Sequence, residues 1–519
     1  MVEIITHGVQ LIAAHRFPAK PEHLFSRESS SGTTTSKESR RLNLSSSSAL
    51  KGRYRLDLTL KGNAGSAART SHGRSFKGAG AQDKVMLSFC GPTNQGDLYH
   101  NGEPELQAKV EFTLGVGKKL GRVGWERLEV YEGGGSETDR RGKTGRSAAF
   151  SAYRLIDPKV GLSEDDHHSR QTILIFAQQD TANFLSRLPD GTPLGGLTLP
   201  GTHESCALYG YPISQCQQPS TPILQQLRDG IRFLDVRLRV VGGELLMYHG
   251  PRPQRSTLTI LLSAIHDFLS THPGETLILC IKQETPPWHP HFSSLLYKAF
   301  KPFLDRWFLE ERIPTLGEVR GKGILLSRFD RSADAEKGDW EWEEGMGIHP
   351  SRWPDSREEG FEWDCAGTTV RTQDWYRVHT FLQIPEKLEA IITHLDPTIM
   401  PSSSTSDNNA NTPFTLSYTS ASYFPLSLPT IIAKGFGYPS WNFGVEGINI
   451  RFCRYLLGLI RDGKRIRATV AMDFYRQSNG GGLSVGDGND LADLLVLMNV
   501  VGVELADRLT AESLAEKGG

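Results

Sequence analysis

Short apolar runs alternate with stretches of helical period along the C-terminal two thirds of this chain, and this alternation is what most constrains its fold. Runs such as 233–241 and 276–282 have the length and apolar content of buried strands. Between them, segments such as 257–272 place apolar residues three and four positions apart, as a helix with one buried face requires. The alternation continues to about residue 509 and amounts to seven or eight β/α units. It predicts an α/β fold, a TIM-type (β/α) barrel.

The N-terminal third has a different pattern, in which apolar and polar residues alternate one by one. Segments 54–60, 85–89 and 110–114 show this period of two, which is typical of strands with one wet face. Residues 24–50 are rich in Ser and Thr and hold too few apolar residues to fold. We therefore expect three parts: a disordered N-terminal segment, an antiparallel β-rich accessory domain and the barrel, over residues 1–50, 51–182 and 183–519.

The charge and hydropathy of the chain exclude two classes of protein. Its 519 residues include 58 Lys and Arg against 59 Asp and Glu, so the basic excess expected of a nucleic-acid-binding protein is missing. No stretch approaches about 18 uninterrupted apolar residues, so we expect no membrane span. The first twenty residues make a poor signal peptide because His7, His15 and Arg16 interrupt their apolar run. A cytoplasmic or peripheral membrane location is favoured, with secretion as the alternative.

Six cysteines in a chain of this length do not form a disulfide scaffold, and no CxxC pair indicates a structural zinc site. Cys206 and Cys216 could bridge one loop in an oxidising compartment. Two free thiols are the favoured state in a cytosolic chain, and the pairing stays open.

Ionisable residues recur where the predicted strands end, which is the edge of a β/α barrel that holds reactive side chains. They are His203, Glu204, Asp235, Arg237, His249 (at the end of the third predicted strand), Lys282, Glu284, Arg328 and Asp473. Singly, each has an ordinary explanation; Asp235 and Arg237, two apart on one strand, could form a structural ion pair. Together they would crowd one barrel mouth with charges that are expensive to bury without a ligand.

Two histidines with an arginine between them suit the cleavage of a phosphodiester. One imidazole can take a proton from the attacking hydroxyl while the other gives a proton to the leaving oxygen. The guanidinium can bind two phosphoryl oxygens and neutralise the charge that grows on them. A carboxylate beside each histidine would fix its tautomer and hold its pKa near the working pH.

The segments around these residues resemble the X region of bacterial-type phosphatidylinositol-specific phospholipase C, over about residues 185 to 510. The matching segments follow the order of the family: LTLPGTHES (197–205), GIRFLDVRLRV (230–240), LLMYHGP (245–251), LILCIKQE (277–284), LLSRF (325–329), RWPD (352–355), TQDWYRV (372–378), LSYTSAS (416–422) and AMDFY (471–475).

This resemblance implies a role for each residue of the predicted mouth. His203 would be the general base acting on the inositol 2-hydroxyl, and His249 the general acid for the diacylglycerol oxygen. Arg237 would bind the phosphate beside Asp235, and Asp473 would orient His203. The products would be diacylglycerol and inositol 1,2-cyclic phosphate, so the reaction is formally a lyase step.

The resemblance also implies the remaining contacts and the substrate. Glu204 stands where the bacterial family usually has an Asp that partners the acid histidine. The side chains implied to contact the inositol hydroxyls are Lys282, Glu284, Arg328, Asp374 and Tyr376. The implied substrate is phosphatidylinositol or a glycosylated inositol phospholipid, reached by peripheral contact with a membrane surface.

The same comparison implies no metal and no other cofactor. The calcium-dependent signalling phospholipases carry a Glu-x-Asp pair where this chain has Asp235-Val-Arg237, and a side-chain cation there leaves little electrostatic room for Ca²⁺. Two alternatives stay open. One is a metal-dependent phosphodiesterase on the same barrel, such as a glycerophosphodiesterase or a sphingomyelinase-D-like enzyme. The other is a catalytically weak module that binds inositol lipids.

Four tryptophans follow the strand that ends at Arg328: Trp340, Trp342, Trp353 and Trp363. Such residues belong either to the core or to a rim of the site that meets lipid head groups. The sequence favours neither of the two.

Overall fold

The chain divides into two compact units, with the main boundary between Gln178 and Gln179. The computed structural model describes residues 2–7, 10–17, 53–56, 84–91, 106–113, 124–132, 150–157, 170–284, 288–331, 342–402, 412–438, 443–476 and 490–500. Among these residues, no helix has both the length and the apolar character needed to cross a bilayer.

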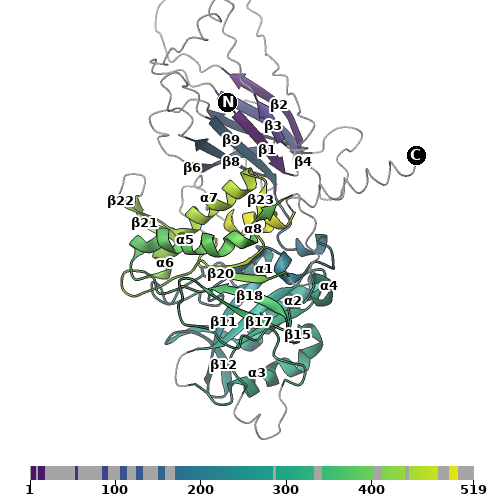
Figure 1. Ribbon diagram of the computed structural model, residues 1–519, viewed down its shortest axis with the longest axis vertical. Coiled ribbons are helices and arrows are strands. Elements are labelled where there is room, and N and C mark those ends of the chain that lie inside the picture. The colour runs from purple at the N-terminus through teal and green to yellow at the C-terminus, as the bar shows by residue number, and fades with distance from the viewer. Residues whose placement is uncertain are drawn as a thin grey trace, which may run out of the picture. The chain divides into compact units, whose positions relative to one another are not determined.

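The first unit contains two β-sheets, one with the strand order β3-β1-β9-β8-β6 and one with the order β2-β4-β5-β7 (Figure 1). The strands are β1 (Val2–His7), β2 (Gln10–Phe17), β3 (Arg53–Leu56), β4 (Lys84–Gly91), β5 (Leu106–Thr113), β6 (Gly124–Leu128), β7 (Val130–Glu132), β8 (Phe150–Asp157) and β9 (Arg170–Ala177). Apolar side chains from both sheets are buried, including Val110, Trp125, Phe150 and Ile175.

This unit differs from the sequence-based prediction in two respects. Strands β1 and β2 lie within the first fifty residues, which the prediction assigns to a disordered segment, and they precede the Ser/Thr-rich stretch 24–50, which lies outside the described residues. In addition, β1 pairs with β9 in parallel, whereas the other described pairs of the unit are antiparallel. A parallel pair needs a long connection, and a local pattern of alternation carries no information about such distant partners.

The second unit is a sheet curled as a TIM-type barrel, as predicted, with the strand order β15-β16-β14-β11-β10-β24-β20-β18-β17. Its strands pair in parallel from β15 to β18, and β17 pairs antiparallel with β18 at the edge. These strands are β10 (Leu199–Thr202), β11 (Phe233–Val241), β14 (Leu277–Gln283), β15 (Trp307–Phe308), β16 (Gly323–Arg328), β17 (Phe361–Cys365), β18 (Thr368–Gln373), β20 (Phe414–Tyr418) and β24 (Thr469–Met472). The last strand returns to lie beside the first, because β24 pairs with β10 in parallel. The hydrogen-bonded path ends at β15 and β17, and among the described residues no strand pairing joins these two ends.

The helices of this unit alternate with the barrel strands along the chain. They are α1 (Ile223–Arg228), α2 (Leu258–Thr271), α3 (Phe292–Phe300), α4 (Leu316–Val319), α5 (Ile384–Leu395), α6 (Pro429–Lys434), α7 (Ile448–Arg461) and α8 (Asp490–Val500). Helix α2 shows why they form. Its apolar residues Leu258, Leu261, Leu262 and Ile265 recur at helical spacing and are buried, and the hydroxyl of Thr257 caps its first turn by accepting a hydrogen bond from the Ile260 amide.

The prediction of the third barrel strand is wrong. Residues 244–250 do not form a barrel strand: β12 (Glu244–His249) turns back antiparallel to β11 and pairs with β13 (Arg252–Thr257). Gly242 and Gly243, both with positive φ, form the reversal between β11 and β12. His249 therefore lies on a hairpin that leaves the barrel. The remaining short strands pair as β19 (Met400–Pro401) with β23 (Lys464–Arg465) and as β21 (Gly435–Tyr438) with β22 (Phe443–Glu446).

A fully buried ion pair lies at the start of the barrel strands, opposite the end where His203 follows β10. Arg232 precedes β11 and donates from Nε and Nη2 to Oε2 of Glu275, at 2.9 and 2.7 Å. Both side chains are 0% exposed. The guanidinium also lies 5.0 and 4.9 Å from the ring centroids of Phe184 and Phe268. Removal of the carboxylate would leave this cation buried without its counter-charge.

We expect Glu275→Ala to lower the free energy of unfolding by about 3–5 kcal/mol, the usual result of breaking a buried pair from one side. Urea unfolding of the purified chain measures it. The matched control is Glu310→Ala, which breaks the exposed pair with Arg312 and should change the free energy by less than about 1 kcal/mol. Equal effects of the two substitutions would contradict the prediction.

Candidate active site

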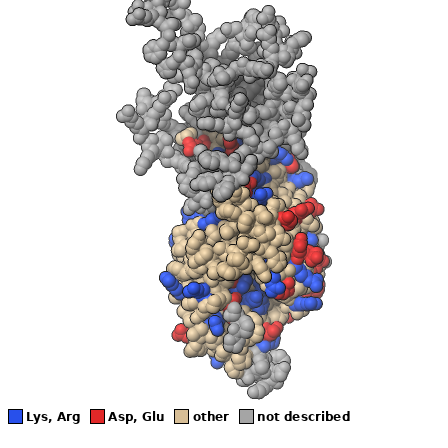
Figure 2. All heavy atoms as spheres, turned by 90° about the vertical axis from the view of Figure 1, so that its left-hand side faces the viewer, with Lys and Arg blue, Asp and Glu red and all other residues tan. Residues whose placement is uncertain are grey.

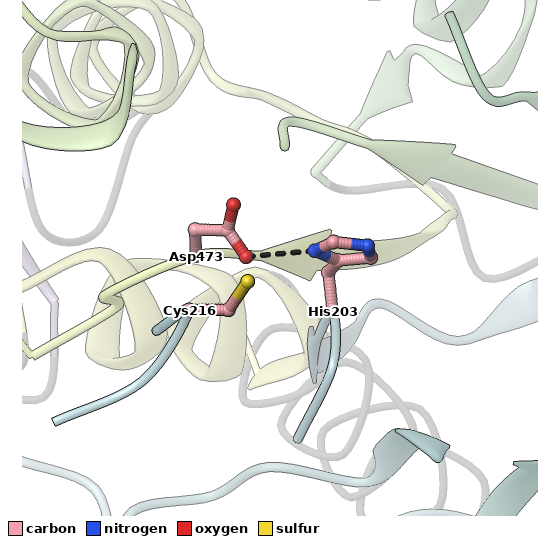
Figure 3. Close-up of side chains that lie close together, drawn as sticks. All are labelled: His203, Cys216 and Asp473. Atoms are coloured by element: carbon pink, nitrogen blue, oxygen red, sulfur yellow. Dashed lines mark hydrogen bonds and ion pairs between the residues drawn. The ribbon is translucent and has the colours of Figure 1, made fainter. Parts of the chain in front are cut away.

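His203 and Asp473 form a hydrogen-bonded pair at the C-terminal edge of the barrel sheet. His203 directly follows β10 and Asp473 directly follows β24, and these neighbouring parallel strands bring the two side chains together. Nδ1 of His203 lies 2.8 Å from Oδ1 of Asp473 (Figure 3). Since a carboxylate only accepts, Nδ1 carries the proton, and Nε2 is the nitrogen that can accept one. Nε2 lies 3.3 Å from Nη2 of Arg237.

The backbone is strained immediately beyond both members of this pair. Glu204 has φ of 43° and Phe474 has φ of 46°, in the left-handed region that residues with a Cβ rarely adopt. Strain of this kind is concentrated at functional sites, where the surrounding structure holds it in place. Here it occurs where the chain leaves β10 and β24.

The electrostatic surroundings favour the protonated form of His203. Burial lowers its pKa, but the charge of Asp473, the hydrogen bond to it and the charge of Asp235 outweigh burial, so the pKa is raised above its ordinary value of 6.5. The charge of Arg237 opposes them. The pair thus behaves as a histidine whose basicity is increased by a buried carboxylate.

His249 ends β12 and faces the same region from the hairpin. Its Nδ1 lies 3.0 Å from the carbonyl oxygen of Ser214, so Nδ1 carries a proton there too and Nε2 points elsewhere. Burial, followed by the charges of Arg237 and His203, lowers the pKa of His249 to about 4. The carboxylate expected beside this histidine is not in hydrogen-bond contact, because Oε1 of Glu204 lies 3.9 Å from Nε2 and 2.6 Å from Nε of Arg237.

Three cations form a row across neighbouring strands. Arg237 on β11 is the register partner of Lys282 on β14, which in turn is the register partner of Arg328 on β16. Residues in register on adjacent strands point to the same face of a sheet, so their charges are close together. Burial, followed by the charges of Arg237 and Arg328, lowers the pKa of Lys282. Such a row is well suited to an anionic ligand.

Carboxylates surround this row. Glu284 lies 3.5 Å from Nη1 of Arg237 through Oε2 and accepts the Gly250 amide at 3.0 Å through Oε1. Asp235 is completely buried, and neither of its oxygens has a hydrogen-bond partner among the described residues. Burial raises the pKa of Asp235, but the charges of Arg237 and Arg328 outweigh it and lower the pKa. An ionised carboxylate without a donor is suited to accept a hydrogen bond from a ligand.

Asp374, Arg328 and Trp353 form a second contact group at the same edge. Asp374 follows β18 and lies 3.6 Å from Nη2 of Arg328, and its Oδ2 accepts a hydrogen bond from the indole of Trp353 at 2.9 Å. The guanidinium of Arg328 stacks on that indole, 3.7 Å from the ring centroid. Tyr376 is two residues further on, where its hydroxyl donates to Asp355.

The expectation that the tryptophans belong to the core is confirmed for two of them, Trp342 and Trp363, and a third has a role that neither expectation covers. Trp353 supports two predicted site residues rather than facing lipid, and this role was missed. Trp342 and Trp363 are buried in the core, and Trp340 lies outside the described residues.

The loop after β10 supplies three further residues that were missed. Ser214 provides the carbonyl that holds His249, and Nε2 of Gln217 donates to the carbonyl oxygens of His203 and Met472 at 2.9 and 2.8 Å. Cys216 places Sγ 3.7 Å from Nδ1 of His249. These residues lie in an irregular loop, where no periodic pattern could indicate them. Cys206 and Cys216 are both buried free thiols in the structure.

Comparisons with known proteins match this part of the chain. Residues 206–329 match the family model "Phosphatidylinositol-specific phospholipase C, X domain". A 1-phosphatidylinositol phosphodiesterase of Listeria monocytogenes is 35% identical over 159 residues, which cover 28% of this chain and 49% of that protein. One of Staphylococcus aureus strain Newman is 24% identical over 163 residues, covering 28% and 51%. The chain thus spans about half the length of these curated relatives.

Solved structures are also similar. A pentafluoro-Phe-containing phosphatidylinositol-specific phospholipase C from Staphylococcus aureus gives a TM-score of 0.47 at 19% identity, covering 61% of this chain and 97% of that one. The enzyme from Listeria monocytogenes gives 0.44 at 21% identity, covering 62% and 98%. The family resemblance seen in the sequence is confirmed by the matches to the family model and the curated relatives.

Proposed function

We propose, from the match of residues 206–329 to the X domain of phosphatidylinositol-specific phospholipase C, that this chain cleaves phosphatidylinositol by an intramolecular reaction. Nε2 of His203 takes the proton of the inositol 2-hydroxyl, whose oxygen attacks the phosphorus. The bond from phosphorus to the glycerol oxygen breaks, and His249 gives that oxygen a proton. The products are diacylglycerol and inositol 1,2-cyclic phosphate. The observation that carries the proposal is the His203–Asp473 pair opposite a second histidine, with Arg237 between them.

Arg237 supports the phosphate step. Its guanidinium approaches Nε2 of His203, and Glu204 and Glu284 hold it in place at 2.6 and 3.5 Å. A guanidinium fixed in this way stabilises charge on two phosphoryl oxygens as the attacking oxygen bonds to phosphorus.

The inositol ring would bind over the row of cations and the carboxylates beside it. Lys282 and Arg328 offer donors, and Asp235, Glu284 and Asp374 offer acceptors, which together suit a ring of hydroxyls. Because Asp355 engages the hydroxyl of Tyr376, we expect Tyr376 to meet the ring through its aromatic face.

Substrate binding would raise the pKa of His249 and so favour its protonated form, which the general acid requires. With the site free of ligand, burial and then the charges of Arg237 and His203 lower its pKa to about 4, which keeps the imidazole neutral at pH 7. A phosphodiester anion beside Arg237 offsets that charge, so the pKa of His249 rises when the substrate binds. The proton needed for the leaving oxygen is then held by His249 in the complex.

Apolar loops around the same edge would meet the membrane that holds the lipid. The loops after β18 and β20 pack together through the rings of His379 and Tyr423, whose centroids are 4.5 Å apart. The exposed large apolar side chains of loops after barrel strands are Tyr211, Ile213, Trp288, Leu382, Tyr423, Phe424 and Leu426. Phe436 on β21 adds to them, and Figure 2 shows uncharged residues across the middle of the side on which β21 and β22 lie. Exposed aromatic and aliphatic residues of this kind favour peripheral contact with lipid.

Phosphorus NMR of the purified chain with phosphatidylinositol vesicles and excess EDTA tests the reaction class and the need for metal together. We expect the signal of a cyclic phosphodiester to grow in EDTA, because Arg237 supplies the positive charge at the phosphate. A phosphomonoester as the first product, or no turnover until a divalent metal is restored, would instead support the metal-dependent phosphodiesterase.

The pH dependence of the rate tests the role of Asp473. A general base must be unprotonated, so kcat/KM rises with pH through the pKa of His203. Asp473→Asn removes a charge that raises this pKa and leaves the burial that lowers it, so the rising limb should move to lower pH. Asp462→Asn, at the exposed end of α7, is the control and should leave the limb unchanged. A limb that stays in place or moves to higher pH in Asp473→Asn would contradict this assignment.

A further inference from the structure

Cys216 lies against the His203–Asp473 pair, and the three side chains form a group with metal-ligand chemistry. The sulfur of Cys216, a ring nitrogen of His203 and a carboxylate oxygen of Asp473 all lie within 4.8 Å of one another. Figure 3 shows the thiol pointing toward the Asp473 oxygen that bonds His203. In the part of the chain that the structure describes, this is the single group of three His, Cys, Asp or Glu side chains gathered so closely.

The proposed reaction does not use the thiol. Cys216 is completely buried, and among the described residues its sulfur makes one long contact, 3.7 Å from Nδ1 of His249. The hydrogen of that Nδ1 is already directed to the Ser214 carbonyl. Burial, followed by the charges of Asp473 and Glu204, raises the pKa of Cys216 well above its ordinary value, so without metal the group is a neutral thiol.

We propose that His203, Cys216 and Asp473 bind a thiophilic divalent cation such as Zn²⁺. Imidazole, thiolate and carboxylate are ligands that zinc takes in proteins, at about 2.0–2.3 Å, which places ligand atoms about 3–4 Å apart. To bind the ion, the ligand atoms that are up to 4.8 Å apart must move closer together, and the His203 nitrogen and the Asp473 oxygen, now 2.8 Å apart, must separate slightly.

The charges balance when the metal binds. The thiol loses its proton to water, and the new thiolate and the carboxylate of Asp473 neutralise the two positive charges of the ion. The imidazole ligates as the neutral base through Nδ1, the nitrogen beside Asp473, and its proton moves from Nδ1 to Nε2. After burial, the charges of Asp473 and Glu204 raise the pKa of the thiol, and the same two charges favour a cation, whereas the charge of Arg237 opposes one. Three protein ligands leave a fourth position open for water.

The bound ion would inhibit the enzyme, a conclusion that rests on the proposed function. When His203 and Asp473 ligate the metal, the hydrogen bond between them is lost. His203 can then no longer act as the general base. Metal binding and proton abstraction therefore exclude each other. The metal would not contact the lipid, but two of its ligands, His203 and Asp473, are the residues of the proposed general base.

Cobalt(II) titration tests binding without reference to activity, because a cobalt–thiolate bond gives a charge-transfer absorption in the near ultraviolet. We expect this band in the wild type and in Cys206→Ala, which removes a neighbouring buried thiol outside the group. The band should be absent from Cys216→Ala. If circular dichroism shows that Cys216→Ala does not fold, Cys216→Ser takes its place, and the band should be absent from it too. The absence of the band from the wild type, or its persistence in folded variants without Cys216, would overturn the proposal.

Inhibition is measured next, with the rate of each variant normalised to its own rate in EDTA. Zn²⁺ should inhibit the wild type. Cys216→Ala should need at least about 10-fold more Zn²⁺ for the same inhibition, since even outer-shell partners change metal affinity by 10–100-fold. Equal sensitivity would overturn the inhibitory role. A Cys216-dependent cobalt band in a protein without lipase activity would uphold the metal site and overturn the proposed function alone.

Discussion

His203→Ala should lower the turnover of phosphatidylinositol by at least about 10³-fold, because general acid–base groups each contribute about 10²–10⁴. The variant removes the Nε2 that faces Arg237 and leaves Asp473 buried without its histidine. The backbone contacts of His203, with Met472 and with Gln217, do not involve its ring, so we expect the chain to fold with reduced stability. Turnover is measured as diacylglycerol release, with circular dichroism as the check on folding.

A substrate with a different leaving group distinguishes the role of His203 from that of His249. With an ester whose leaving oxygen needs no proton, such as a nitrophenyl phosphodiester of inositol, His249→Ala should recover most of its activity while His203→Ala should not. His272→Ala, at the end of α2, is the matched control and should retain the wild-type rate. A His203→Ala enzyme with a tenth of the wild-type rate would remove His203 from the mechanism.

Vesicles that differ only in head group should show the second large effect, with phosphatidylcholine cleaved at least about 10⁴-fold more slowly than phosphatidylinositol. Sites built to hydrogen-bond hydroxyls reject ligands that lack them by factors of this size. Choline offers no hydroxyls to the acceptors Glu284 and Asp374 or to the donors Lys282 and Arg328. It also lacks the neighbouring hydroxyl that attacks phosphorus, so no intramolecular step is available to it.

Phosphatidylinositol 4,5-bisphosphate should also be a poor substrate. The row of Arg237, Lys282 and Arg328 already faces Glu204, Glu284 and Asp374 among its neighbours, so few cations remain for added phosphates. Diacylglycerol release is compared among the three lipids at equal surface concentration. Comparable rates on phosphatidylinositol and phosphatidylcholine would contradict both the head-group assignment and the intramolecular mechanism.

The sequence was sufficient to predict the barrel and most of the residues at its mouth, for a physical reason. Parallel strands are buried on both faces, so strands such as β14 and β16 stand out as apolar runs, and the C-terminal ends of such strands converge. Residues that directly follow a strand, such as His203 and Asp473, can then be placed together without knowledge of their distance along the chain.

What the sequence could not predict lies outside this rule. The antiparallel turn of β12 against β11 depends on pairing partners, and an apolar run looks the same in either direction. The contacts of Ser214 and Cys216 come from an irregular loop, and the stacking of Trp353 under Arg328 joins residues that no periodicity relates. The position of the Glu204 carboxylate, 2.6 Å from Nε of Arg237 and 3.9 Å from Nε2 of His249, could be read only from the structure.

The hairpin that carries His249 has a consequence for how this catalyst could diverge. Among the described residues β12 joins the barrel sheet through β11 alone, whereas His203, Asp473 and Arg237 stand on or beside barrel strands. In the reaction we propose, the group that gives a proton to the departing alcohol would lie on this hairpin, apart from the barrel strands whose residues would activate the attacking oxygen. Changes in the length of the β12–β13 hairpin would then alter which leaving alcohols are accepted, while the inositol hydroxyl could still attack the phosphorus. Selection could therefore retune one half of the reaction without disturbing the other.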